Sequence, residues 1–107
     1  MICEWRVYKA PPGKMPNLQA RFRDHTCRIF ERHGLHVVGF WTAAEGEETH
    51  LYYLLSFPDA AAREKSWETF MADPEWKQVR ADSERDGRIV ESLEKVVLKP
   101  TDYSPLQ

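Results

Sequence analysis

Two apolar segments in the middle of the chain carry large side chains on both of their faces. Residues 35–43 (LHVVGFWTA) and 49–57 (THLYYLLSF) are rich in β-branched and aromatic residues, which favour β-strands. Successive side chains along a strand point to opposite faces. In the first segment, one face carries Leu35, Val37 and Trp41 and the other carries Val38 and Phe40. In the second segment, one face carries Leu51, Tyr53, Leu55 and Phe57 and the other carries Tyr52 and Leu54. Both faces of the resulting sheet need a cover, because several exposed groups of this size would form an aggregation-prone patch.

The rest of the chain alternates strand signals with helix signals. Met15, Leu18 and Phe22 recur at three- and four-residue steps, which is typical of an amphipathic helix. Trp67 and Trp76 fall on the apolar sides of two further helices and are predicted to be core residues. We predict strands at residues 2–9, 35–43, 49–57 and 88–98, helices at residues 14–33, 60–72 and 74–86, and an extended tail at residues 99–107.

This order of elements predicts a single domain over residues 1–107, of the α+β class. The simplest arrangement is ferredoxin-like, a four-stranded antiparallel sheet with its helices on one face. The second face then lacks a cover, and the most economical one is the equivalent sheet of another copy related by a two-fold axis. Such a homodimer would enclose a barrel-like interior. The alternatives are that a loop or the tail covers this face, or that a different partner does.

Composition limits the partners that the protein can have. The chain has 15 Lys and Arg residues against 17 Asp and Glu residues, a net charge of −2, so no global basic field attracts nucleic acid or an anionic membrane. No apolar run approaches the roughly 20 residues that cross a bilayer, and residues 1–10 lack the apolar core of a secretory signal. We therefore expect a cytoplasmic protein. Two cysteines are too few for a disulfide framework or a structural zinc site.

Three polar residues of the first strand are candidates for a binding site. Glu4, Arg6 and Tyr8 share one face of residues 2–9, and the first strand is central in a ferredoxin-like sheet. We hypothesise that they line a pocket inside the barrel, where Arg6 binds an anionic or carbonyl group and Tyr8 donates a hydrogen bond. The alternative is a structural ion pair between Glu4 and Arg6, or pairs across the dimer, with no ligand.

Three further residues complete the candidate pocket: His36, Trp41 and Tyr103. Trp41 could stack on a planar ligand, and Tyr103 lies in a proline-containing tail that could edge the pocket or simply be disordered. His36 and His50 are on strands that we expect to pair, so they could lie close together. The spacing of the four histidines is no metal-ligand signature, and we predict no metal site.

Short motifs along the whole chain resemble those of the NIPSNAP family, in the family's order. They are EWRVY at residues 4–8, PGK at 12–14, GFWT at 39–42, Trp67, DPEW at 73–76 and LKPTDYSPL at 98–106. The resemblance implies the dimeric α+β barrel fold, which agrees with the argument from the two apolar sheet faces. It also implies that no particular reaction is to be expected, since bacterial members of the family mostly have none assigned.

We therefore expect a small homodimeric NIPSNAP-type protein that binds a small hydrophobic or aromatic ligand in the barrel interior and needs no cofactor. The alternative is an enzyme. The related dimeric α+β barrels include cofactor-independent monooxygenases and haem-degrading oxygenases, and in that case Arg6, Tyr8 and His36 are the candidate reactive groups. GxSxG, HExxH, Gly-rich phosphate-loop and CxxC motifs do not occur, so hydrolase, zinc-protease, nucleotide-binding and thioredoxin-like functions lack support.

Overall fold

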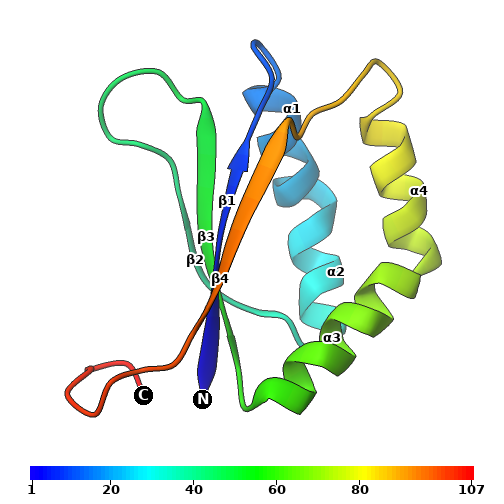
Figure 1. Cartoon of the computed structure of the whole chain (residues 1–107). Helices are drawn as coiled ribbons and strands as arrows, with labels where there is room; N and C mark the ends of the chain where they lie inside the picture. The colour runs from blue at the N-terminus through cyan, green and yellow to red at the C-terminus, as the bar shows by residue number, and fades with distance from the viewer.

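The computed structural model describes all 107 residues and has two layers, an antiparallel sheet and a layer of helices on one of its faces (Figure 1). The elements are β1 (Ile2–Lys9), α1 (Met15–Arg21), the π-type segment η1 (Phe22–Thr26), α2 (Cys27–Arg32), β2 (His36–Trp41), β3 (His50–Phe57), α3 (Ala60–Ala72), α4 (Pro74–Ser83) and β4 (Ser92–Leu98). Every predicted strand and helix is present. The second and fourth strands and the last helix are shorter than predicted.

The strands are ordered β2-β3-β1-β4, and every neighbouring pair is antiparallel. β1 is central, as the ferredoxin-like arrangement requires. Arg6 lies opposite Tyr53 of β3 and Lys95 of β4. Trp5, on the other face, lies opposite Leu54 and Val96. The predicted fold class is therefore confirmed.

One segment of sequence forms three consecutive helical pieces. The predicted helix at residues 14–33 is interrupted by the wider turns of η1, which continue directly into α2. The Thr26 hydroxyl donates to the carbonyl oxygen of Arg21 at 3.2 Å across this segment, and both residues are buried. Such π-type turns are frequent at functional sites. Arg21 and Phe22 lie where α1 meets η1.

The core lies between the sheet and the helices. Strand alternation sends Tyr53, Leu55 and Phe57 of β3 into it, where they are fully buried. Phe30 of α2 and Phe70 of α3 meet there with ring centroids 4.9 Å apart. No helix in the structure has both the length and the apolar character needed to cross a membrane.

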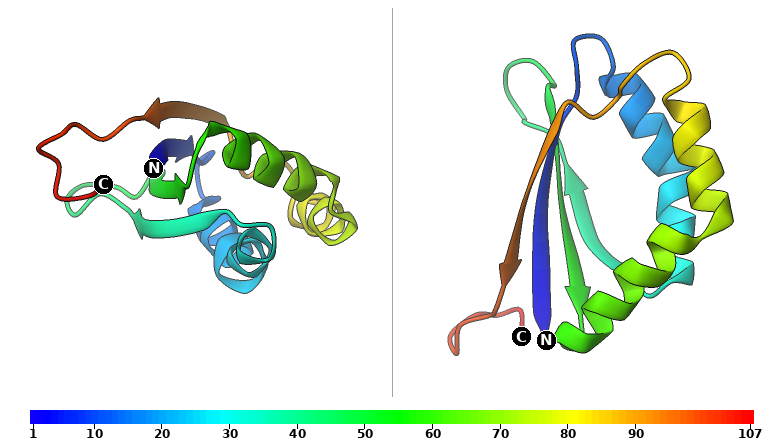
Figure 2. Two further views of the ribbon diagram at one scale, coloured as in Figure 1. Left: turned by 90° about the horizontal axis from the view of Figure 1, so that it is seen from below. Right: turned by 45° about the vertical axis from the view of Figure 1, so that its right-hand side comes forward.

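The opposite face of the sheet, which we call the open face, has no helix over it (Figure 2). On this face the ring centroid of Trp5 lies 6.0 Å from that of Trp41 and 6.0 Å from that of Tyr52. With the tail in place, 48% of Trp41 and 52% of Val96 remain exposed. The prediction that both sheet faces carry large apolar groups is confirmed.

A β-bulge corrects one detail of that prediction. The pairing of β2 with β3 shifts between Val37 and Gly39, so an extra residue enters the alternation. Val37 and Phe40 lie opposite the inward-facing Leu55 and Tyr53, whereas Trp41 lies opposite Tyr52 on the open face. The prediction that Trp41 shares a face with Val37 is therefore wrong.

Candidate functional site

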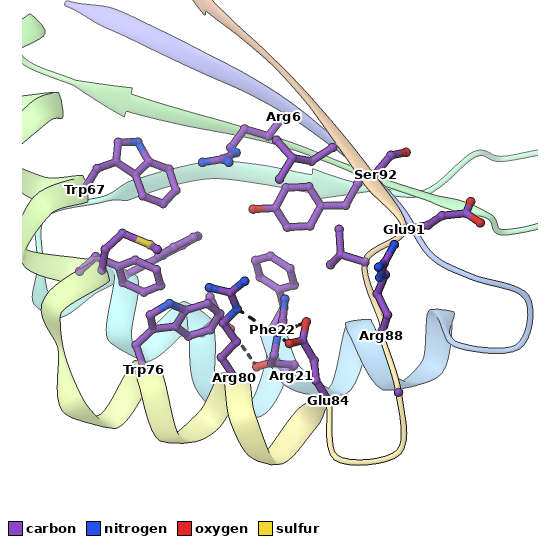
Figure 3. Close-up of a pocket in the computed structure, with 18 residues that line it drawn as sticks. Arg6, Arg21, Phe22, Trp67, Trp76, Arg80, Glu84, Arg88, Glu91 and Ser92 are labelled. Carbon is purple, nitrogen blue, oxygen red and sulfur yellow. Dashed lines mark hydrogen bonds and ion pairs between the residues drawn. The ribbon is translucent and has the colours of Figure 1, made fainter.

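A cavity of about 620 Å³ lies between the sheet and the helices of the single chain (Figure 3). Its volume is within the range of about 300–1,000 Å³ that is usual for small-molecule sites. Half of its lining residues are hydrophobic, 9 of 18. The aromatic part of the wall is formed by Tyr8, Phe22, Phe30, Trp67, Phe70 and Trp76, and the charged part by Arg6, Arg21, Arg80, Glu84, Arg88 and Glu91.

The corner between α3 and α4 positions the tryptophan side of the cavity. Asp73 is the N-cap of α4, and its carboxylate accepts from the backbone N–H of Glu75 at 2.7 Å and of Trp76 at 3.3 Å. Arg32 and His33 of the first helical segment also reach this carboxylate, at 2.6 Å and 2.5 Å. Hydrogen bonds from Arg32 and then His33 hold the pKa of Asp73 well below its usual range. The Asp73 carboxylate therefore links the start of α4, which carries Trp76, to the end of α2.

Glu4 is the centre of a buried polar cluster behind the cavity wall. Its Oε1 atom accepts from Arg63 Nε at 2.7 Å and from Trp67 Nε1 at 2.8 Å. Its Oε2 atom lies 3.3 Å from Arg6 Nη1. The side chain of Glu4 is fully buried. The ion pair between Glu4 and Arg6, which sequence reasoning weighed against a pocket, is therefore present alongside one.

Two arginines meet the cavity from opposite layers, each over a tryptophan. The Cζ atom of Arg6, from β1, lies 4.4 Å from the ring centroid of Trp67. The Cζ atom of Arg21, from α1, lies 5.2 Å from that of Trp76. Burial lowers the pKa of Arg21, against the opposing effect of Glu84. Such contacts are favourable cation–π pairs, and they combine charge with flat apolar surface.

A pair of tyrosines supplies a hydroxyl group to the wall. Tyr53 is fully buried, and its hydroxyl donates to the hydroxyl oxygen of Tyr8 at 2.9 Å. Burial raises the pKa of Tyr53 well above its usual value, which keeps this donor protonated. Because the Tyr8 oxygen accepts this bond, the hydroxyl proton of Tyr8 is free for another acceptor, and Tyr8 lines the cavity.

The structure separates the six residues that sequence reasoning grouped into one pocket. Arg6 and Tyr8 line the cavity, and Glu4 lies directly behind them. His36 lies opposite Ser56, so like Trp41 it is on the other side of the sheet. Tyr103 is 84% exposed in the tail. This cavity also differs from the expected barrel interior, because it lies within one chain and not between two sheets.

The expected proximity of the two strand histidines is not observed. His36 lies opposite Ser56 at one end of the β2–β3 pair, whereas His50 begins β3 at the other end and lies opposite Lys9. Antiparallel pairing therefore keeps them apart. No group of three histidine, cysteine or acidic side chains converges in a way that could hold a metal ion.

Sequence reasoning missed the arginines that the helices contribute. Arg21 follows Leu18 by three residues and precedes Phe22, so it falls within the apolar stripe of its helix. A charged residue inside such a stripe is a signal that could have been used. Trp67 and Trp76 were predicted as core, and they do pack against Phe70, but both also line the cavity.

Comparisons with known proteins place the chain in a family. The NIPSNAP family model matches residues 3–105. A NIPSNAP family protein with unknown function from Agrobacterium tumefaciens is 26% identical with a TM-score of 0.85, over 100% of this chain and 94% of that one. An uncharacterized NIPSNAP domain protein from Burkholderia xenovorans is 25% identical with a TM-score of 0.84, over 98% and 99%.

The fold also extends to more distant proteins. A putative antibiotic biosynthesis monooxygenase from Nitrosomonas europaea is 12% identical with a TM-score of 0.67, over 94% of this chain and 98% of that one. This likeness concerns the fold alone. No curated protein is significantly similar to the chain. From the match over nearly its full length, the chain belongs to the NIPSNAP family.

Proposed function

We propose that this protein binds a small aromatic or otherwise apolar molecule in the cavity between its sheet and its helices, and that it works as a homodimer. The observation that carries the binding function is the combination of cavity volume, about 620 Å³, with a wall that contains six aromatic residues and six charged ones. Sites for small molecules combine aromatic and other apolar surface with placed polar groups that fix the orientation of the ligand. Arg6 and Tyr8 supply those donors here.

Two fluorescent aromatic probes test the binding function, 8-anilinonaphthalene-1-sulfonate and N-phenyl-1-naphthylamine. Saturable binding of at least one probe, with about one site per chain, is expected. Leu93 lies at the start of β4, lines the cavity and is half exposed, so Leu93→Trp can fill the space without disturbing the core. This variant should weaken binding at least ~10-fold, because the ring occupies the volume of the ligand, whereas Leu93→Ala should retain it. Absence of binding by both probes, or binding unaffected by Leu93→Trp, contradicts the proposal.

The homodimer is supported by the open face. Trp5, Trp41 and Tyr52 form an aromatic cluster on it, and burying one large apolar side chain contributes roughly 1.5–3 kcal/mol. A second copy provides a complementary apolar sheet through two-fold symmetry. Native mass spectrometry should therefore detect twice the mass of one chain. Trp41→Asp should shift the protein to a monomer, and Met71→Asp should not, because Met71 is equally exposed at 48% but lies in the helix layer. A wild-type monomer at micromolar concentration would refute the dimer.

An oxygenase is the second candidate. The hydroxyl pair of Tyr8 and Tyr53 at an aromatic-walled cavity favours it, together with the fold shared with a putative antibiotic biosynthesis monooxygenase. Oxygen uptake with a quinol-type substrate, and degradation of added haem followed by loss of its Soret absorbance, decide between the two functions. Pure binding predicts neither signal. Oxygen uptake that is lost in Tyr8→Phe would establish the enzyme instead.

A further inference from the structure

The guanidinium group of Arg6 is buried but makes no hydrogen bond. A guanidinium carries five N–H donors, and Arg6 is 9% exposed. Its one charged partner is Glu4, whose Oε2 atom lies 3.3 Å from Nη1 in an ion pair without hydrogen-bond geometry, and neither Arg6 Nε nor Glu4 Oε2 has a hydrogen-bond partner. Leaving buried donors of a charged group unpaired is costly, so native structures rarely do so without a reason. Because Arg6 lines the cavity, a ligand there would bring an acceptor to its guanidinium.

Glu4 does not neutralise the positive charge around it. It is shared between Arg6 and Arg63, and its two short hydrogen bonds go to Arg63 and Trp67. One carboxylate thus faces two guanidinium groups. The cluster keeps one excess positive charge, and of the two arginines it is Arg6 that lines the cavity.

The helix side of the cavity repeats this imbalance. Glu84 lies 3.8 Å from Arg21 and 3.9 Å from Arg80, so again one carboxylate faces two guanidinium groups. The remaining acidic residue of the wall, Glu91, is paired with Lys9 at 3.2 Å. The whole chain has a net charge of −2, so the positive excess is a property of the cavity. A cavity lined by charges of one sign attracts ligands of the opposite sign.

The surroundings of Arg6 determine how an anion would be held. The Cζ atom of Arg6 lies over the Trp67 ring, 4.4 Å from its centroid, and Figure 3 shows the two side chains next to each other. A guanidinium presents its N–H groups in one plane, which matches two oxygens of a carboxylate or a sulfonate. Tyr8 lies beside it, with its ring centroid 5.5 Å from Arg6 Cζ and with a hydroxyl proton that Tyr53 does not use. The two side chains form a donor set against an aromatic wall.

We propose that the cavity selects aromatic organic anions, and that Arg6 anchors their carboxylate or sulfonate group with a further hydrogen bond from Tyr8. This inference rests on the proposed binding function and specifies its ligand class. The aromatic body of the ligand lies against the rings of Phe22, Phe30 and Trp67, and its charge offsets the excess positive charge of the wall.

The same two probes test the ligand class, because N-phenyl-1-naphthylamine is 8-anilinonaphthalene-1-sulfonate without the sulfonate. We expect the sulfonate to bind at least ~10-fold more tightly, which corresponds to one charge-assisted hydrogen-bonded contact. Arg6→Gln should abolish this preference, weakening the sulfonate ~10-fold or more and the neutral probe less than ~3-fold. Arg63→Gln is the matched control. It removes the same charge from the same cluster, but its side chain does not line the cavity, so its effect should be smaller than that of Arg6→Gln.

The outcomes separate the inference from the binding function. If neither probe binds, the binding function fails and the ligand class fails with it. If both probes bind with equal affinity, or if Arg6→Gln weakens both by the same factor, the protein binds aromatic molecules but the anion anchor is refuted. A loss in Arg63→Gln as large as in Arg6→Gln would show that general charge, and not contact with Arg6, attracts the sulfonate.

Discussion

Glu4 and Arg6 form an ion pair, yet replacing each should have a very different effect on stability. Glu4 is fully buried and has three cationic or N–H partners, Arg63, Trp67 and Arg6. Arg6 has only Glu4 as a charged partner and makes no hydrogen bond. If Arg6 is held in the wall to bind a ligand and not to support the fold, Glu4→Gln must cost more folding free energy than Arg6→Gln.

The expected magnitudes follow from these contacts. Removing one partner of a buried charge pair typically costs about 3–5 kcal/mol. The amide of Glu4→Gln still offers an oxygen to Arg63 and Trp67, and Arg63 is partly exposed, so we expect the low end, about 3 kcal/mol. Arg6→Gln leaves Glu4 both of its short hydrogen bonds and removes a guanidinium that makes none, but it also loses the cation–π contact with Trp67, so we expect a loss of about 1 kcal/mol.

Urea denaturation of the two variants and the wild type, at one protein concentration, measures this difference. Tryptophan fluorescence reports the transition, since Trp67 lies in the cluster itself. The double variant should be less destabilised than the sum of the two single ones, because removing both charges leaves no unpaired Arg6. If Arg6→Gln loses as much stability as Glu4→Gln, Arg6 is a structural residue and is not held in the wall for a ligand.

Three further predictions concern other parts of the fold. The pKa of Asp73 is lower in the folded state than its unfolded value of about 4, so the ionised carboxylate stabilises the fold above that pH, and this stabilisation is lost as the pH falls below it. Acid unfolding of Asp73→Asn should therefore lack the loss of stability that the wild type shows below about pH 4. A Cβ at Gly39 would lie 2.7 Å from the Trp41 ring, so Gly39→Ala should displace that ring. We expect the dimer dissociation constant, measured by analytical ultracentrifugation, to rise ~10-fold. An unchanged constant would show that Trp41 is not part of the interface. Tyr53→Phe should cost about 1 kcal/mol in urea denaturation, and Tyr8→Phe about 1–3 kcal/mol because it leaves the buried Tyr53 hydroxyl unpaired; the reverse order would contradict the assigned donor.

Hydrophobic periodicity predicted which segments form helices and strands. A one-residue irregularity in β2 limited the prediction of which sheet face each side chain occupies. Alternation along β3 correctly separated Tyr53 from Tyr52, because its pairing is regular. In β2 the bulge before Gly39 reverses the alternation, so Trp41 was assigned to the wrong face. A glycine within a strand is a recognised sign of a bulge, but it does not say which residue is the extra one.

The residues of the candidate site could be predicted only where their position depends on a single strand. Arg6 and Tyr8 were found because their spacing places them on one face of β1. The pairing of Arg21 with Glu84 depends on how α1 packs against α4, and residues 63 apart in sequence give no local signal of that contact. The position of the cavity within one chain likewise follows from the packing of the helix layer, which periodicity does not specify.

A crystal structure with bound 8-anilinonaphthalene-1-sulfonate tests the central claim most directly. We expect the aromatic rings to lie between β1 and the helix layer of one chain, against Phe22, Phe30 and Trp67, with the sulfonate within hydrogen-bond distance of Arg6. A probe bound on the open face against Trp5 and Trp41, with the sheet–helix cavity empty, would contradict it.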